Sequence, residues 1–253
     1  MIPYFVFDKI IVGGLTIYVW GLMASVGFLA ALIISLKEAK RKNISQEIVW
    51  DLVLIILLGV IIGSRGCYVL WHWDEFKNNF TKIFFLWEGG LSSVGGIILA
   101  GVAGLLYARY KKLNIWRTAD LLTPGIISAV IFTRIGCFLV GSHVGKITDL
   151  FLGREYFDGT IRHPVALYFT VSAVVLFLIT WRLRKRLKKD GLLFLIFIAC
   201  YLAVRFFIDF TRCDDLLLIC ENRLRGLTYS QWMFLILLFP VLGALKRKAG
   251  IFS

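Results

Sequence analysis

Residues 119–140, ADLLTPGIISAVIFTRIGCFLV, decide how this sequence can fold. The run is apolar and long enough to cross a bilayer as a helix, since a crossing takes about 20 such residues. Arg134 is the one full charge in its interior. Burying a guanidinium at this depth costs at least about 2.5–3.5 kcal/mol, so it needs a partner. Its planar fork favours a phosphate or carboxylate, although a carbonyl or Asp of a neighbouring helix would also serve.

The composition extends the membrane interpretation to the whole chain. Of its 253 residues, 59% are hydrophobic, and the mean hydropathy is +0.80. These values exclude a soluble domain and a disordered chain. We predict an all-α integral membrane protein forming one polytopic domain over residues 1–253. Its seven transmembrane helices are expected near residues 15–36, 51–70, 91–108, 119–140, 164–180, 192–210 and 227–245.

The distribution of basic residues predicts the orientation. Of 29 Lys and Arg, 17 lie in three short connections and the C-terminal tail, and nine lie on the opposite side. The positive-inside rule places the N-terminus outside (periplasmic) and the C-terminus in the cytoplasm. Periplasmic loops then fall at about residues 71–90, 141–163 and 211–226. The placement of the basic residues on one side of the membrane explains the net charge of +13, so we expect no nucleic-acid partner.

Three arginines remain, each inside an apolar segment: Arg65, Arg134 and Arg205. Each lies five or six residues from the outer end of its segment, so the three share one depth. The only acidic residue of a span at that level is Asp209, one helical turn beyond Arg205. One carboxylate cannot neutralise three guanidiniums. Either an anion, here a phospholipid headgroup, lies among them, or they snorkel to the interface.

Other residues near this level have two interpretations. His143 is a candidate acid/base or headgroup contact, or an ordinary loop histidine. Gly90 and Gly95 belong to a glycine-rich run that permits either close approach of a ligand or tight helix packing. Gly136 and Gly141 would let a bulky partner reach Arg134. Cys213 and Cys220 share one outer loop and could pair or remain free thiols. Cysteine and histidine spacing predicts no metal.

Seven ordered stretches resemble one family, the prolipoprotein diacylglyceryl transferases of the bacterial inner membrane. The stretches are VWGLMASVGFLAALI (19–33), GSRGCYVLWHWDEF (63–76), WEGGLSSVGG (87–96), TRIGCFLVGSHVG (133–145), RHPVALY (162–168), YLAVRFFIDFTRCDD (201–215) and GLTYSQW (226–232). The fourth is similar to the family signature Gly-Arg-Ile-Gly-Asn-Phe, and the fifth to Arg-His-Pro-x-Gln-Leu-Tyr. Any one match alone would be weak, whereas seven in order are specific.

The resemblance implies transfer of a diacylglyceryl group from phosphatidylglycerol to the lipobox cysteine of a prolipoprotein, with release of glycerol phosphate. It implies that Arg134 is the signature arginine that binds phosphatidylglycerol and that Arg205 is the essential arginine of the sixth helix. Tyr201, Asp209 and Arg212 would be companions of Arg205, and Arg65 would match the arginine of the second helix. We expect no cofactor, a prolipoprotein signal peptide as partner, and a monomer that crosses the inner membrane several times.

The chain departs from the family pattern where an acceptor's proton would be handled. Val94 replaces a histidine sometimes proposed as the base, Cys137 replaces the signature asparagine, and Ser142 replaces an often acidic residue. Ala166 and Trp20 also differ. His143 is the nearest replacement base, and Asp209 is the second. Two alternatives stay open: a divergent paralogue with a different periplasmic acceptor, a glycan or lipid, and a non-enzymatic protein that binds anionic lipids.

Overall fold

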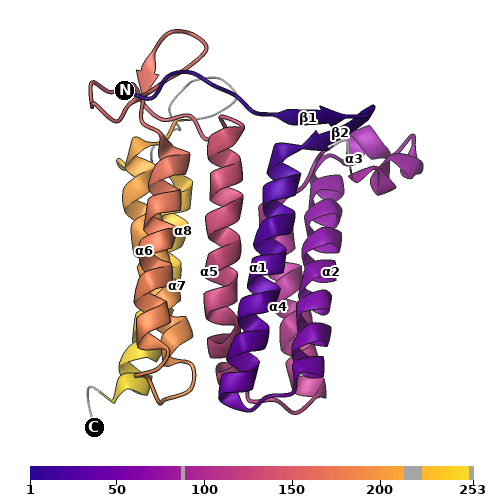
Figure 1. Cartoon of the computed structure of the whole chain (residues 1–253), viewed down its shortest axis with the longest axis vertical. Coiled ribbons are helices and arrows are strands. Elements are labelled where there is room, and N and C mark those ends of the chain that lie inside the picture. Colours follow the sequence, from indigo (N-terminus) through magenta and orange to yellow (C-terminus); the bar gives the residue numbers. More distant parts are fainter. Residues whose placement is uncertain (87–88, 214–223, 251–253) are drawn as a thin grey trace. The chain divides into compact units, whose positions relative to one another are not determined.

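The computed structural model of the protein describes residues 1–86, 89–213 and 224–250. Within these ranges, seven helices are long and apolar enough to cross a membrane (Figure 1). This confirms the predicted all-α, seven-helix membrane class. They are α1 (Val19–Lys42), α2 (Gln46–Trp71), α4 (Ser93–Tyr110), α5 (Ile115–Leu139), α6 (Val165–Leu183), α7 (Leu192–Ile208, with its spanning stretch continuing to Thr211) and α8 (Tyr229–Ala249).

The N-terminal region differs from the prediction. Residues 15–18, assigned from sequence to the first helix, form strand β2 (Leu15–Tyr18), which pairs antiparallel with β1 (Lys9–Val12). Gly13 and Gly14 form the two-residue turn with φ of 57° and 87°. Glycine suits this turn because both positions need positive φ. The membrane helix therefore begins at Val19.

Short elements occupy the connections between the long helices. After α2 come α3 (Trp73–Phe76) and the 3₁₀ helix η1 (Phe80–Phe84). Strands β3 (Arg154–Glu155) and β4 (Ile161–Arg162) pair in the connection before α6. A 3₁₀ turn, η3 (Asp209–Thr211), extends the end of α7.

The chain divides into two compact units. Unit 1 comprises Met1–Ser35 and Ala119–Ser253, and unit 2 comprises Leu36–Thr118. In unit 2, α2 packs closely on α4 through small residues. A Cβ added to Gly63 would stand 2.4 Å from the carbonyl oxygen of Gly95, and one added to Gly96 would stand 2.3 Å from Ser64 Oγ.

Unit 1 contains α6 to α8 and most of α1 and α5. Helices α6, α7 and α8 pack in chain order, and Gly136 of α5 lies against Met23 of α1. Asp120 of α5 anchors the start of α7, where its carboxylate accepts hydrogen bonds from the backbone N–H groups of Gly191 (2.8 Å) and Phe194 (2.9 Å). A carboxylate at a helix N-terminus satisfies otherwise unpaired N–H groups and complements the helix dipole.

The N-terminal segment before β1 is tied to two elements of unit 1. Ile2 donates its N–H to Gly153, and its carbonyl accepts from Glu155 (3.0 Å). Phe7 donates to the carbonyl of Leu139, the last residue of α5 (2.9 Å). The segment therefore covers the end of α5.

Candidate active site

Arg134 of α5 and Arg205 of α7 converge on one aromatic ring. Their guanidinium carbons lie 4.8 and 4.5 Å from the ring centroid of Phe169, a buried residue of α6. Arg205 also lies 5.4 Å from the ring of Phe234 on α8. Each contact is a favourable cation–π geometry. The shared ring also holds two like charges near one another, which an anion between them would stabilise.

Neither arginine forms a salt bridge with a carboxylate within the described ranges. Arg134 Nη1 lies 3.1 Å from His143 Nε2, its one hydrogen bond in the described structure. Arg205 makes no hydrogen bond or ion pair to any described residue, and its Nε is buried without a partner. Buried donors are seldom left unpaired. The two guanidiniums thus present free N–H donors of the kind that bind phosphate bidentately.

Asp209 makes no hydrogen bond or salt bridge to Arg205, although it stands one helical turn away. The Asp209 side chain is 1% exposed, and its Oδ2 accepts a hydrogen bond from Ser230 Oγ at 2.5 Å. Its Oδ1 is buried with no partner among the described residues. Ser230 also lies 3.0 Å from Thr228 Oγ1, inside the capping box that begins α8. Asp209 is therefore oriented by α8 and keeps one oxygen available.

The loop after α5 is attached to the end of α7, which brings His143 into the same unit as both arginines. Cys213 donates its N–H to Val144 (3.1 Å), and Lys146 donates to Thr211 (2.9 Å). His143 itself has a φ of 65°, in the left-handed region that non-glycine residues seldom adopt. Such a conformation costs on the order of 1–3 kcal/mol and persists only where the surroundings impose it.

The companions of Arg205 are held around the same helix end. Tyr201 lies one turn earlier on α7, so the two side chains share a face of the helix, and its ring is 5.8 Å from that of Phe197. Arg212 follows η3, and its backbone bridges to Gly145. Cys213 is disulfide-bonded, so the free-thiol alternative for this residue was wrong. Cys220 lies outside the described residues.

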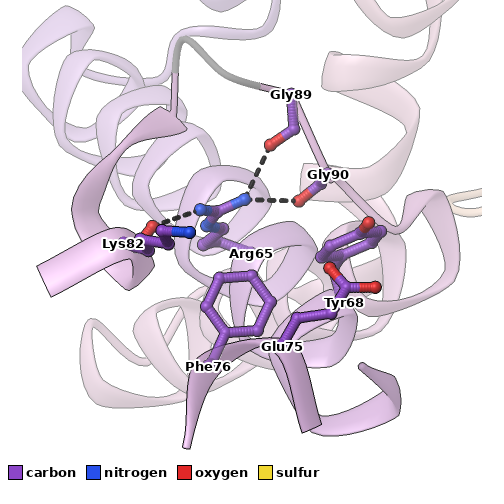
Figure 2. A pocket seen from close by; sticks show the side chains of 7 residues that line it. All are labelled: Arg65, Tyr68, Glu75, Phe76, Lys82, Gly89 and Gly90. Carbon is purple, nitrogen blue, oxygen red and sulfur yellow. Dashed lines mark hydrogen bonds between the residues drawn. The ribbon is translucent and has the colours of Figure 1, made fainter. Parts of the chain in front are cut away.

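Arg65 belongs to unit 2, where backbone carbonyls surround its guanidinium (Figure 2). Its Nε donates to Ile83 (2.8 Å), and its Nη1 donates to Gly89 (2.6 Å) and Gly90 (3.1 Å). Its Nη2 donates to Lys82 (2.5 Å) and Phe85 (3.3 Å). The side chain, 6% exposed, lines a cavity of about 170 Å³. These bonds hold the loop before α4, and the lipid contact expected of Arg65 stays a prediction.

Removing the Arg65 side chain is expected to loosen that loop. In Arg65→Met, up to five carbonyls lose their donor, and each buried polar group left unpaired costs about 1–3 kcal/mol. We expect a lower thermal unfolding temperature and faster proteolysis between residues 77 and 90, measured on detergent-purified protein. Arg65→Lys keeps the charge but not the fork, and should show most of the same defect. Wild-type stability in both variants would contradict the structural role.

The four glycines predicted as site residues have two structural roles, helix packing and turns. Gly95 and Gly136 lie in helix contacts: a Cβ on Gly95 would stand 2.2 Å from Cys67 Cβ, and one on Gly136 would stand 3.0 Å from Met23 Cβ. Gly90 (φ 71°) offers its carbonyl to Arg65, and Gly141 (φ 72°) makes the turn before His143. In the described structure, the segments that closely approach Gly95 and Gly136 are therefore other helices.

Three residues of this region were missed by sequence reasoning. Phe169 is one of many apolar residues in its helix, and nothing in the sequence distinguishes it. Arg154 was counted only as an outer-loop charge. Ser230 had a signal, since Thr228 and Gln231 form a recognisable capping box around it.

Comparison with known proteins identifies relatives along most of the chain. The profile of the family described as prolipoprotein diacylglyceryl transferase matches residues 9–245. A protein of Pediococcus pentosaceus, named phosphatidylglycerol–prolipoprotein diacylglyceryl transferase, is 30% identical over 94% of this chain and 88% of its own length. A protein of the same name from Geobacillus kaustophilus is 34% identical over 81% of this chain and 80% of its own.

Proposed function

Since this chain belongs to the prolipoprotein diacylglyceryl transferase family, we propose that it transfers the diacylglyceryl group of phosphatidylglycerol to the lipobox cysteine thiol of prolipoproteins. Glycerol phosphate is the second product. The observation that carries the proposal is the pair of guanidiniums, Arg134 and Arg205, which share the Phe169 ring and form no salt bridge with any carboxylate of the described residues. A buried pair of this kind fits a lipid phosphodiester.

The reaction forms one C–S bond and breaks one C–O bond. The acceptor sulfur attacks the glyceryl carbon next to the phosphate ester oxygen, and that oxygen leaves with the phosphate. Negative charge grows on the leaving phosphate, where N–H donors of Arg134 and Arg205 stabilise it more strongly than in the bound donor. Stabilisation that increases toward the transition state is what lowers the barrier.

The thiol proton passes to a group beside the arginines, and we assign that role to His143. Its Nε2 is 3.1 Å from Arg134 Nη1, which links it to the phosphate ligands. With Val94 at the family's histidine position, no base is available there. Asp209, with its unpaired Oδ1, is the second proton acceptor in this proposal. In this proposal, Tyr201 and Arg212 contact the donor lipid beside Arg205.

A variant at His143 should show a defect that depends on pH. His143→Ala is expected to slow transfer about 10²-fold at neutral pH, because positioned general bases contribute about that much. The defect should shrink above pH of about 8.5, where a free thiol ionises without help. The control is His163→Ala. His163 pairs with Tyr168 Oη (3.1 Å), and burial together with Lys146 lowers its pKa, so it stays neutral. An equal defect at every pH would exclude His143 as the base.

The proposed function is tested by following radiolabel from phosphatidylglycerol, labelled in its acyl chains, into a lipobox peptide in nanodiscs. We expect labelled peptide and free glycerol phosphate in equal amounts, and no labelling when the lipobox cysteine is Ser. Binding of phosphatidylglycerol without transfer to any thiol peptide would overturn the proposal.

The finer points of location follow from the same proposal. We propose residence in the bacterial inner membrane, with the N-terminus periplasmic and the C-terminus cytoplasmic, because the basic residues gather in the connections on one side. We also propose that the protein acts as a monomer, since one unit supplies Arg134, Arg205 and His143.

A further inference from the structure

A second cavity, of about 300 Å³, lies in unit 1 beside the proposed active site. Three segments wall it: the N-terminal segment, the loop after α5 and the β3–β4 hairpin. They contribute Tyr4 and Val6, Ser142 and His143, and Arg154 and Tyr156, respectively. Because His143 lines the cavity and also lies 3.1 Å from Arg134, one side chain separates this space from the phosphate ligands.

Arg154 gives the cavity a positive charge, and no carboxylate of the described residues forms a salt bridge with it. Its side chain is 2% exposed and lies among three rings, with its guanidinium carbon 4.5 Å from the Phe5 centroid, 4.9 Å from Phe138 and 5.7 Å from Tyr156. It donates to the carbonyls of Phe138 (2.7 Å) and Phe5, while its Nε has no partner among the described residues. Burial lowers the pKa of Arg154, but a guanidinium stays charged at neutral pH.

The remaining lining selects the chemistry of the ligand. Tyr4, Ser142 and Tyr156 bring hydroxyl groups, and none of the described residues that line the space is acidic. Such a lining suits a neutral or anionic polyol and disfavours an ammonium group, which would meet only positive charge. The volume is at the low end of the range for ligand pockets, about 300–1,000 Å³, so a small headgroup fits and acyl chains do not.

We propose that this cavity holds the headgroup glycerol of the donor lipid and thereby selects phosphatidylglycerol over other phospholipids. The inference rests on the proposed function: with the phosphate at Arg134 and Arg205, the glycerol extends past His143 toward Arg154. The N-terminal segment forms one wall of this specificity pocket. Its attachment through Arg154 to the end of α5 keeps the pocket in shape.

The proposal is tested with a substitution in the N-terminal segment that reduces the volume of the cavity. Val6→Trp adds bulk at a lining residue that is 43% exposed, so the protein should still fold. Val12→Trp makes the same change on β1, at a residue that is 62% exposed and outside the cavity. For each protein, kcat/KM is measured with phosphatidylglycerol and with phosphatidylmethanol, which has the same phosphodiester but no headgroup glycerol.

We expect the wild type and Val12→Trp to prefer phosphatidylglycerol at least about tenfold, because hydroxyl partners left unpaired penalise the analogue. Val6→Trp should lose that preference by slowing only with phosphatidylglycerol. Tyr4→Phe, which removes one hydroxyl from an exposed side chain, should lower the preference in the same direction. No preference in the wild type, or an unchanged preference in both Val6→Trp and Tyr4→Phe, would overturn the proposal.

A binding measurement without acceptor distinguishes glycerol phosphate from inorganic phosphate as the ligand of the cavity. It also tests the headgroup pocket independently of the proposed transfer reaction. Free glycerol phosphate should raise the unfolding temperature of the wild type and Val12→Trp more than equal inorganic phosphate, and should not do so in Val6→Trp. This shift in a protein without transfer activity would support a glycerol phosphate site in the cavity and contradict the proposed function. Transfer without any headgroup preference would support the proposed function and contradict the headgroup pocket. A response to glycerol phosphate alone, with no donor preference, would show a product site and overturn the specificity role.

Discussion

Arg205→Ala is expected to lower kcat for transfer by about 10²–10³-fold, the effect typical of removing one donor that stabilises developing charge. Arg205 makes no hydrogen bond to any described residue, so the substitution removes N–H donors to the substrate phosphate together with the contacts to the Phe169 and Phe234 rings. Arg134→Ala should be similarly impaired, with an added effect through His143. Arg205→Lys should recover only part of the rate, because an ammonium group lacks the planar fork.

The control for these arginines is Arg184→Ala. Arg184 also stacks on an aromatic ring, with its guanidinium carbon 3.2 Å from the Trp181 centroid, but it follows the last residue of α6 in a basic connection. We expect this variant to keep the wild-type rate. Rates should be measured on protein whose unfolding temperature matches the wild type. A folded Arg205→Ala variant with the wild-type rate would remove Arg205 from the mechanism.

Gly95→Ala is expected to destabilise unit 2 strongly. The added Cβ would stand 2.2 Å from Cys67 Cβ and 2.3 Å from the carbonyl oxygen of Gly63, closer than real Cβ atoms come. Both obstacles belong to α2, so the helices must move apart. Overpacking of this kind costs about 1–3 kcal/mol or more. Gly101→Ala on the same helix meets nothing within 4 Å and should be neutral or slightly stabilising.

The same pair of variants separates packing from lipid contact at Gly95. A packing role predicts reduced yield and a lower unfolding temperature for Gly95→Ala, measured in detergent without substrate, with Gly101→Ala near the wild type. A substrate role predicts normal stability for both proteins and a raised KM for phosphatidylglycerol in Gly95→Ala alone. That second result would contradict the packing of α2 on α4 described above.

The seven spans were predictable because length and hydropathy report directly on membrane crossing. The helix start at Val19 was not, since the apolar run of residues 15–18 suits a helix as well as a strand. Gly13 and Gly14 were the overlooked signal for a hairpin turn. The start of such a helix depends on whether the preceding residues pair with another strand, and hydropathy carries no information on strand pairing.

The charge pattern also predicted part of the site. Buried charges at one depth singled out Arg134 and Arg205, which the structure places on one ring. The charge pattern could not predict the carbonyls around Arg65, because they belong to a loop whose path the sequence does not specify. It likewise had no means of finding Phe169 or the cavity beside Arg154, which exist only after distant segments pack.

The central claim is that Arg134 and Arg205 hold one lipid phosphate between them. The direct measurement is an experimental structure of the protein in nanodiscs of phosphatidylglycerol, without acceptor. We expect a phosphate within hydrogen-bond distance of both guanidiniums, about 2.7–3.2 Å. Guanidiniums that contact only protein and water, with the ordered lipid phosphate elsewhere, would contradict this role of Arg134 and Arg205.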